Sequence, residues 1–134
     1  MTSFKSVICG LALVVSLVAA TSPGHSARVG EKAALQATMQ QHIDRNLVKG
    51  AFLHLDTETG QVRRLYPLRA HPMILRMGEY FVLCSDFRDV AGKSVNVDFY
   101  VARDADSYVI FHSAVDDRGS LERWLSEGKV EHFK

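Results

Sequence analysis

Cysteine is almost absent from this 134-residue chain, which has only Cys9 and Cys84. Because Cys9 lies inside an apolar N-terminal segment, the rest of the chain has one thiol and no internal disulfide. A chain of about a hundred residues can bury a core without such a bond. We therefore expect one small domain that is stabilised by apolar packing.

Motifs for catalysis, metal binding and nucleotide binding are also missing. The chain has no glycine-rich phosphate loop and no serine nucleophile elbow. Its potential metal ligands lack the paired spacing of zinc and calcium sites. They are His54, Asp56, His71, Asp98 and His112. We therefore expect no metal and no cofactor.

The first 27 residues have the pattern of a secretory signal peptide. Lys5 supplies the positive start, residues 7–20 are apolar, and residues 21–27 are small or polar. Cleavage after Ala20 and cleavage after Ala27 both remain open. A retained membrane anchor is the alternative, but the apolar segment is shorter than the ~20 residues that span a bilayer. We predict a periplasmic or secreted protein without a membrane span after cleavage.

The charge balance identifies no partner. Removing residues 1–27 takes away Lys5, one of 16 basic residues, and none of the 15 acidic residues, so the mature chain is formally neutral. We therefore expect no nucleic-acid partner. Residues 61–78 form the one segment with a local excess of positive charge, because they contain arginines and no acidic residue. These arginines could bind an anionic ligand or pair with the domain's own acids. They are Arg63, Arg64, Arg69 and Arg76.

Apolar residues at every fourth position predict an amphipathic helix near residues 31–48. Gly50 is suited to end this helix. The apolar stripe should pack on a sheet. It consists of Leu35, Met39, Ile43 and Leu47.

Residues 80–115 contain three alternating apolar runs, which predict an antiparallel meander with one buried face. The turn lengths suggest pairing Arg88 with Ser94 and Ala102 with Tyr108. The predicted core face holds Phe81, Leu83, Phe87, Val95, Val97, Phe99, Val101, Val109, Phe111 and Val115. The predicted outer face has a row with Asp98 in the middle, namely Cys84, Asp98 and His112. The alternation determines which side chains face the core, whereas a shift of the strand pairing by two residues, which would keep the same faces, stays open.

A second hairpin is predicted from residues 51–55 and 62–66 around an Asp-to-Gly turn. Pro67 should end its second strand or hold it at an edge, with an irregular link up to Pro72. Near the C-terminus, Ser120 can cap a short helix, which Gly128 can end. Trp124 would then cover one end of the core.

Together these elements predict a single α+β domain over residues 28–134. One long N-terminal helix packs on an antiparallel sheet of about five strands, and a short C-terminal helix follows.

Two segments also resemble a known group. "GAFLHLDTETGQVRRL" has an Asp-x-x-Thr-Gly turn, and "YFVLCSDFRDVAGKSVNVDFYV" has a repeated Asp-Phe pair around a glycine. In these features the chain resembles small secreted bacterial domains, and its helix and curled sheet are similar to the cystatin-like architecture. The resemblance implies the fold and no activity. The Gln-x-Val-x-Gly hairpin of cystatin inhibitors is missing, so it implies no protease inhibition.

Two classes of function follow from the residues. The first is a binding or accessory domain whose partner is another protein, an anionic ligand or an envelope component, with self-association left open. Its candidate ligand-binding residues are Tyr80, Asp98, Tyr100, His112, Arg63 and Arg64. The second is a small hydrolase or redox protein that uses Cys84 and His112, with Asp98 beside them. The order of this row is wrong for a catalytic triad, since the carboxylate separates the thiol from the imidazole.

Overall fold

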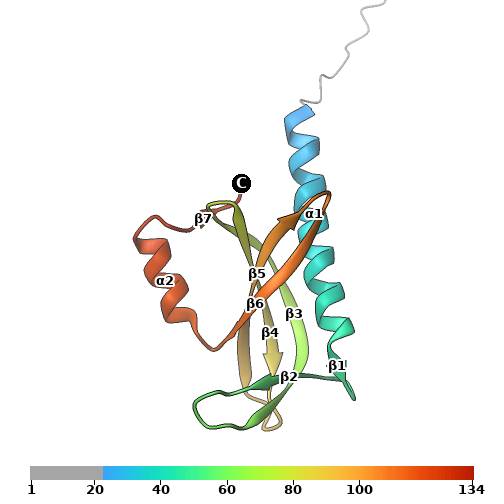
Figure 1. Cartoon of the computed structure of the whole chain (residues 1–134), viewed down its shortest axis with the longest axis vertical. Helices are drawn as coiled ribbons and strands as arrows, with labels where there is room; N and C mark the ends of the chain where they lie inside the picture. Colours follow the sequence, from blue (N-terminus) through green and yellow to red (C-terminus); the bar gives the residue numbers. More distant parts are fainter. Residues whose placement is uncertain (1–22) are drawn as a thin grey trace, which may run out of the picture.

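The computed structural model describes residues 23–134, in which a seven-stranded antiparallel sheet lies between two helices (Figure 1). The predicted signal sequence up to Ser22 lies outside the described residues. None of the helices between residues 23 and 134 has the length and hydropathy of a membrane span. The elements are α1 (Pro23–Arg45), β1 (Leu47–Val48), β2 (Ala51–Leu55), β3 (Val62–Met77), β4 (Tyr80–Arg88), β5 (Ser94–Asp104), β6 (Ser107–Val115), α2 (Arg118–Ser126) and β7 (Glu131–His132).

The strands follow one another in the order β1-β2-β3-β4-β5-β6, and β7 pairs with β3. The α+β class is therefore confirmed, with more strands than predicted. Of the two alternatives predicted for Pro67, the end of the strand was wrong, because β3 continues to Met77. The edge position is confirmed, since β2 pairs only with residues 62–65 and Pro67 pairs with β4 alone. The ladder between β3 and β4 accommodates the prolines through irregularities between Pro67 and Arg69 and between Ala70 and Ile74.

Helix α1 is longer at its start and shorter at its end than predicted. It begins at Pro23 and ends at Arg45, because Leu47 and Val48 leave the helix to pair with β2. Gly50 does not end the helix. Together with Lys49 it makes the two-residue turn between β1 and β2, in which both residues have positive φ, as such tight hairpins require.

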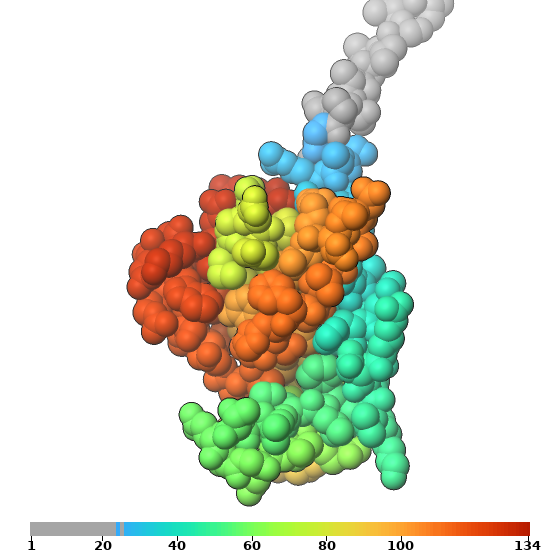
Figure 2. Space-filling view, viewed as in Figure 1, coloured from blue at the N-terminus to red at the C-terminus, as the bar shows by residue number. Residues whose placement is uncertain are grey.

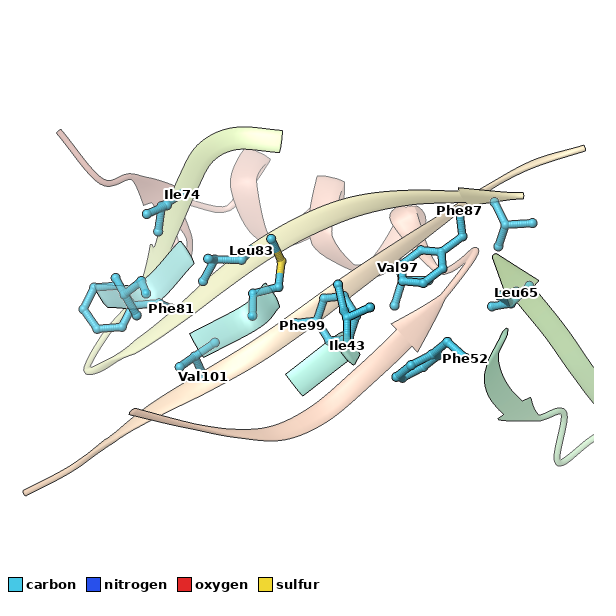
Figure 3. Packing of buried hydrophobic residues seen from close by; sticks show 13 residues of the cluster. Ile43, Phe52, Leu65, Ile74, Phe81, Leu83, Phe87, Val97, Phe99 and Val101 are labelled. Atoms are coloured by element: carbon cyan, nitrogen blue, oxygen red, sulfur yellow. The ribbon is translucent and has the colours of Figure 1, made fainter. Parts of the chain in front are cut away.

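The predicted apolar stripe of α1 does pack on the sheet. Leu35, Met39 and Ile43 are fully buried against the face of β4 and β5 that carries Leu83 and Phe99 (Figure 3). Every residue predicted for the core face of β4 and β5 is buried. The pairing of Arg88 with Ser94 is also confirmed. The alternation of apolar and polar residues in β5, and the position of Phe81, Leu83 and Phe87 on one parity of β4, explain this success.

Strand β6 departs from the prediction. Its turn shifts the register by one residue from the predicted pairing of Ala102 with Tyr108, since Ala102 pairs with Val109 and Asp104 pairs with Ser107. A bulge then follows between Tyr100 and Val101. As a result Tyr108 and Ile110 pack against the core, whereas Val109 is 47% and Phe111 is 53% exposed. The core assignment of Val109 and Phe111 was therefore wrong, whereas that of Val115 holds, because it packs against the same core.

Helix α2 covers the opposite face of the sheet from α1 (Figure 1). It starts at Arg118, before the predicted cap Ser120, and it ends before Gly128 as predicted. Trp124 does not close the end of the α1-side core. Its ring meets that of Tyr100 edge-on at 6.4 Å, in a second apolar cluster beneath α2. The residues buried in this cluster are Leu75, Val82, Cys84, Tyr100, Ala114, Leu121 and Val130.

Candidate functional site

The predicted row of Cys84, Asp98 and His112 exists only in part. Cys84 is paired with Asp98 across β4 and β5, as expected. The shift in β6, however, places Ala114 opposite Asp98 and His112 opposite Tyr100. The prediction that His112 lies beside Asp98 was therefore wrong. The exposed imidazole packs instead against the ring of Tyr100, with 5.5 Å between centroids.

Asp98 is buried under α2 and is 1% exposed, which contradicts its assignment to an accessible face. Neither carboxylate oxygen has a hydrogen-bond partner among the described residues. The nearest cation is Arg118, whose Nη2 lies 3.9 Å from Asp98 Oδ1. Burial raises the pKa of Asp98, and the nearby Cys84 thiol and the charges of Arg118 and His71 oppose this rise only in part. The site therefore favours a neutral carboxyl group.

Cys84 is equally unsuited to act as a nucleophile. Burial, followed by the neighbouring Asp98, raises the pKa of the thiol to about 12. Its side chain belongs to the apolar cluster beneath α2. Since thiolate is the reactive form, this environment gives the hydrolase or redox class no support.

Arg118 connects α2 to this buried polar group. Its Nε donates to Asn96 Oδ1 at 3.1 Å, next to the weak pair with Asp98. Asn96 is in turn paired with Asp86, whose carboxylate bonds His71 Nε2 at 2.8 Å. The polar side chains on this face therefore have a structural role, because they link β3, β4 and β5 to α2.

The arginines of residues 61–78 divide into two groups. Arg63 pairs with Asp116 at 3.1 Å, and Arg69 pairs with Asp86 at 3.4 Å, so both charges are balanced within the domain. Arg64 instead donates to the backbone oxygen of Val48, and Arg76 to that of Gly78. No carboxylate among residues 23–134 lies within ion-pair distance of these last two guanidinium groups.

The outer side of β6 is not paired with another described strand. This nine-residue strand ends the strand order, and within residues 23–134 no strand pairs with its outer side. From Ser107 to Val115 it contains no Lys, Arg, Asp, Glu or Pro. Such residues commonly protect an edge strand from pairing with another chain. Its only interruption is the bulge near Phe111.

A groove of about 570 Å³ accompanies the first half of this edge. One wall is β6 at residues 107–110 and the other is α1, which contributes small side chains at Ala34, Ala37 and Thr38 and polar ones at Gln41, His42, Arg45 and Asn46. The Tyr108 hydroxyl, which donates to Glu31 Oε1 at 3.0 Å, ties the strand to α1. Sequence reasoning missed the groove, because nothing local in the chain indicates that α1 lies beside β6.

The outer surface next to β6 is aromatic. Tyr80 and Phe111 meet edge-on at 5.4 Å, and both are exposed. Behind them lies the buried Tyr100, whose centroid is 6.4 Å from that of Phe111. Of the predicted ligand-binding residues on this face, Tyr80 and His112 are accessible and Asp98 and Tyr100 are not.

A scan against protein-family models finds no match, and searches of curated proteins and of solved structures find no significant similarity. The resemblance to cystatin-like secreted domains therefore stays a prediction.

Proposed function

We propose that this chain is a non-enzymatic binding domain, secreted or periplasmic, which binds an extended segment of a partner protein along the free side of β6. The observation that carries the proposal is an edge strand without charge or proline, open on one side and bordered by a groove. An added strand would satisfy its own backbone hydrogen bonds on the edge, which is a common mode of peptide recognition.

The two sides of the edge explain how such a segment would be selected. Alternate side chains of an added strand point to opposite faces of the sheet. One set would enter the groove, where Ala34 and Ala37 leave room beside α1. The other set would meet the exposed side chains of Val109 and Phe111. The binding segment should therefore carry apolar side chains on the face that meets Val109 and Phe111, and side chains on its other face that suit a groove lined also by Arg45 and Asp106.

The bulge limits the length of the paired segment. It interrupts the ladder of β6 between Ile110 and His112, so a regular added strand can pair with residues 107–110 before the edge bends. The groove spans the same four positions. We therefore place the main contact in this half of the strand.

Peptides selected from a random display library on the folded protein provide a test that needs no prior ligand. We expect the selected peptides to shift the NMR signals of residues 107–110 and of α1, and to slow amide hydrogen exchange in β6. Val109→Lys should abolish binding, because a lysine opposes strand addition at an edge. Val90→Lys is the matched control, since Val90 is exposed in the distant turn between β4 and β5.

Three results would overturn the proposal. The first is that Val109→Lys and Val90→Lys bind the peptides equally. The second is that the peptides shift the NMR signals of residues on a different surface. The third is a concentration-dependent dimer that Val109→Lys abolishes, which would make a second copy of this chain the occupant of the edge.

A further inference from the structure

The hairpin of β2 and β3 presents a second surface, at the opposite end of the sheet from the β5–β6 turn. It projects beyond α2 at the lower end of the molecule (Figure 2). The register pairs Leu55 with Val62 and Leu53 with Arg64, so these four side chains lie on one face. The other face carries Phe52 and Leu65, which are buried in the core.

The first of these faces is apolar although it is open to solvent. Leu55 is 56% and Val62 is 59% exposed at the end nearest the turn. Leu53 and Tyr66 continue the strip toward β4 and are also exposed. We call these residues the hairpin face: Leu53, Leu55, Val62, Arg64 and Tyr66. No described element covers these side chains, although four of the five are apolar.

Cations accompany this strip. Arg64 lies in its middle, and Arg88 is paired with Tyr66 across β3 and β4. Neither guanidinium has a carboxylate within ion-pair distance among residues 23–134. Lys49, which follows the Val48 carbonyl that Arg64 contacts, is exposed as well.

Acidic side chains at this end of the molecule lie in the turns. Asp56 Oδ1 accepts hydrogen bonds from the backbone N–H groups of Glu58 and Thr59. Asp89 Oδ1 accepts them from Ala91 and Lys93 in the same way. Glu58 is exposed in the β2–β3 turn, and Asp116 pairs with Arg63, whose side chain lies on the opposite face of the hairpin from Arg64. The paired strands of the hairpin face therefore carry positive charge only.

We propose that the hairpin face docks on an anionic lipid surface. Apolar side chains that flank unpaired cations suit the boundary between lipid headgroups and acyl chains, where the apolar groups insert and the cations meet phosphate. Arginine is well suited to this contact, because its guanidinium forms paired hydrogen bonds with phosphate oxygens. This contact is independent of the β6 edge, which lies elsewhere on the sheet.

Vesicle co-sedimentation of the protein tests the proposal. We expect binding to vesicles of equimolar phosphatidylglycerol and phosphatidylcholine, and much weaker binding to phosphatidylcholine alone. The double variant Arg64→Gln/Arg88→Gln should bind the anionic vesicles about thirtyfold more weakly. Raising the salt concentration should weaken vesicle binding by the wild type and have less effect on vesicle binding by this variant.

A second variant isolates the apolar contribution. Leu55→Ser/Val62→Ser should reduce binding to the anionic vesicles about tenfold or more, because two inserted side chains are lost. Arg123→Gln on α2 is the control for charge, since Arg123 is exposed and far from the hairpin in sequence and fold. Val109→Ser is the control for apolar loss. Equal midpoints of urea unfolding would show that every variant is folded.

The proposal fails if the wild type does not bind anionic vesicles, or if the hairpin variants bind as the wild type does. It also fails if Arg123→Gln reduces binding as strongly as the double variant, which would indicate attraction by overall charge. If the hairpin variants lose binding to an acidic protein and not to vesicles, then the surface serves a protein partner instead.

Discussion

Replacing Asp98 with asparagine tests the most unusual group in the structure, a buried carboxyl without hydrogen bonds. Asparagine has nearly the same shape and cannot ionise. The groups that face Asp98 are Cys84 across the β4–β5 ladder and Arg118 from α2, with His71 and Asp117 further away. Because burial is the largest influence and raises the pKa of Asp98, the folded state binds this proton more tightly than the unfolded state does.

The sign of the effect follows from this difference. Below the unfolded value of ~3.9 both states are protonated, and Asp98 has no pH-dependent effect. As pH rises from there through the raised folded value, the unfolded state loses its proton first and the wild type loses stability. Each unit of elevation corresponds to about 1.4 kcal/mol. Because the acid is buried and has no hydrogen-bond partner, we expect the wild type to lose about 1–3 kcal/mol of its free energy of unfolding over this pH range.

Urea unfolding between pH 4 and pH 8 measures the effect. Other acids also titrate here, including Asp86, whose pKa is lowered chiefly by its hydrogen bond with His71 and whose contribution therefore has the opposite sign. The difference between wild type and Asp98→Asn removes their contribution. We expect the free energy of unfolding of Asp98→Asn to rise relative to that of the wild type as pH rises. Asp106→Asn, in the exposed β5–β6 turn, should show no such relative rise. Parallel curves, or a variant that becomes relatively weaker toward pH 8, would refute this reasoning and indicate a stabilising ion pair with Arg118.

Three further predictions concern the core and the thiol. Phe99→Ala should lower the free energy of unfolding by about 3–5 kcal/mol, because Phe99 is fully buried in the middle strand, and an unchanged urea midpoint would contradict that core face. Phe111→Ala should lower it by less than about 1 kcal/mol, since the bulge leaves this ring exposed, and a loss as large as that of Phe99→Ala would restore the sequence-derived register. A thiol-reactive probe should label Cys84 slowly in the native protein and rapidly in urea, because the raised pKa of about 12 leaves almost no thiolate at neutral pH; rapid native labelling would revive the redox class.

The amino-acid sequence by itself determined the features that depend on local periodicity. The stripe of α1 repeats every four residues, and in β4 and β5 most of the large apolar residues share one parity, which identifies the face that packs against α1. The turn at Asp56 and Gly60 was also predictable, since the carboxylate bonds nearby N–H groups and Gly60 adopts a positive φ.

Strand β6 shows where this local information ends. Four apolar residues follow one another from Tyr108 to Phe111, so no polar residue marks the outer side. The side that faces the core then depends on the turn length and on the bulge, and both arise from pairing with β5. The turn shifts the register by one residue, and the bulge at Phe111 shifts it by one more, so Phe111 is exposed and His112 lies opposite Tyr100 and not opposite Asp98.

The candidate sites depended on contacts between residues that are far apart in the sequence. Asp98 alternates with buried residues as an exposed side chain would, yet α2 folds back over it from 20 or more positions away and removes it from water. Likewise, the groove exists because α1 packs beside β6, and the edge is free because the strand order ends there. Periodicity specifies which side of an element is apolar, whereas only tertiary packing decides what covers each side and which surfaces stay open to a partner.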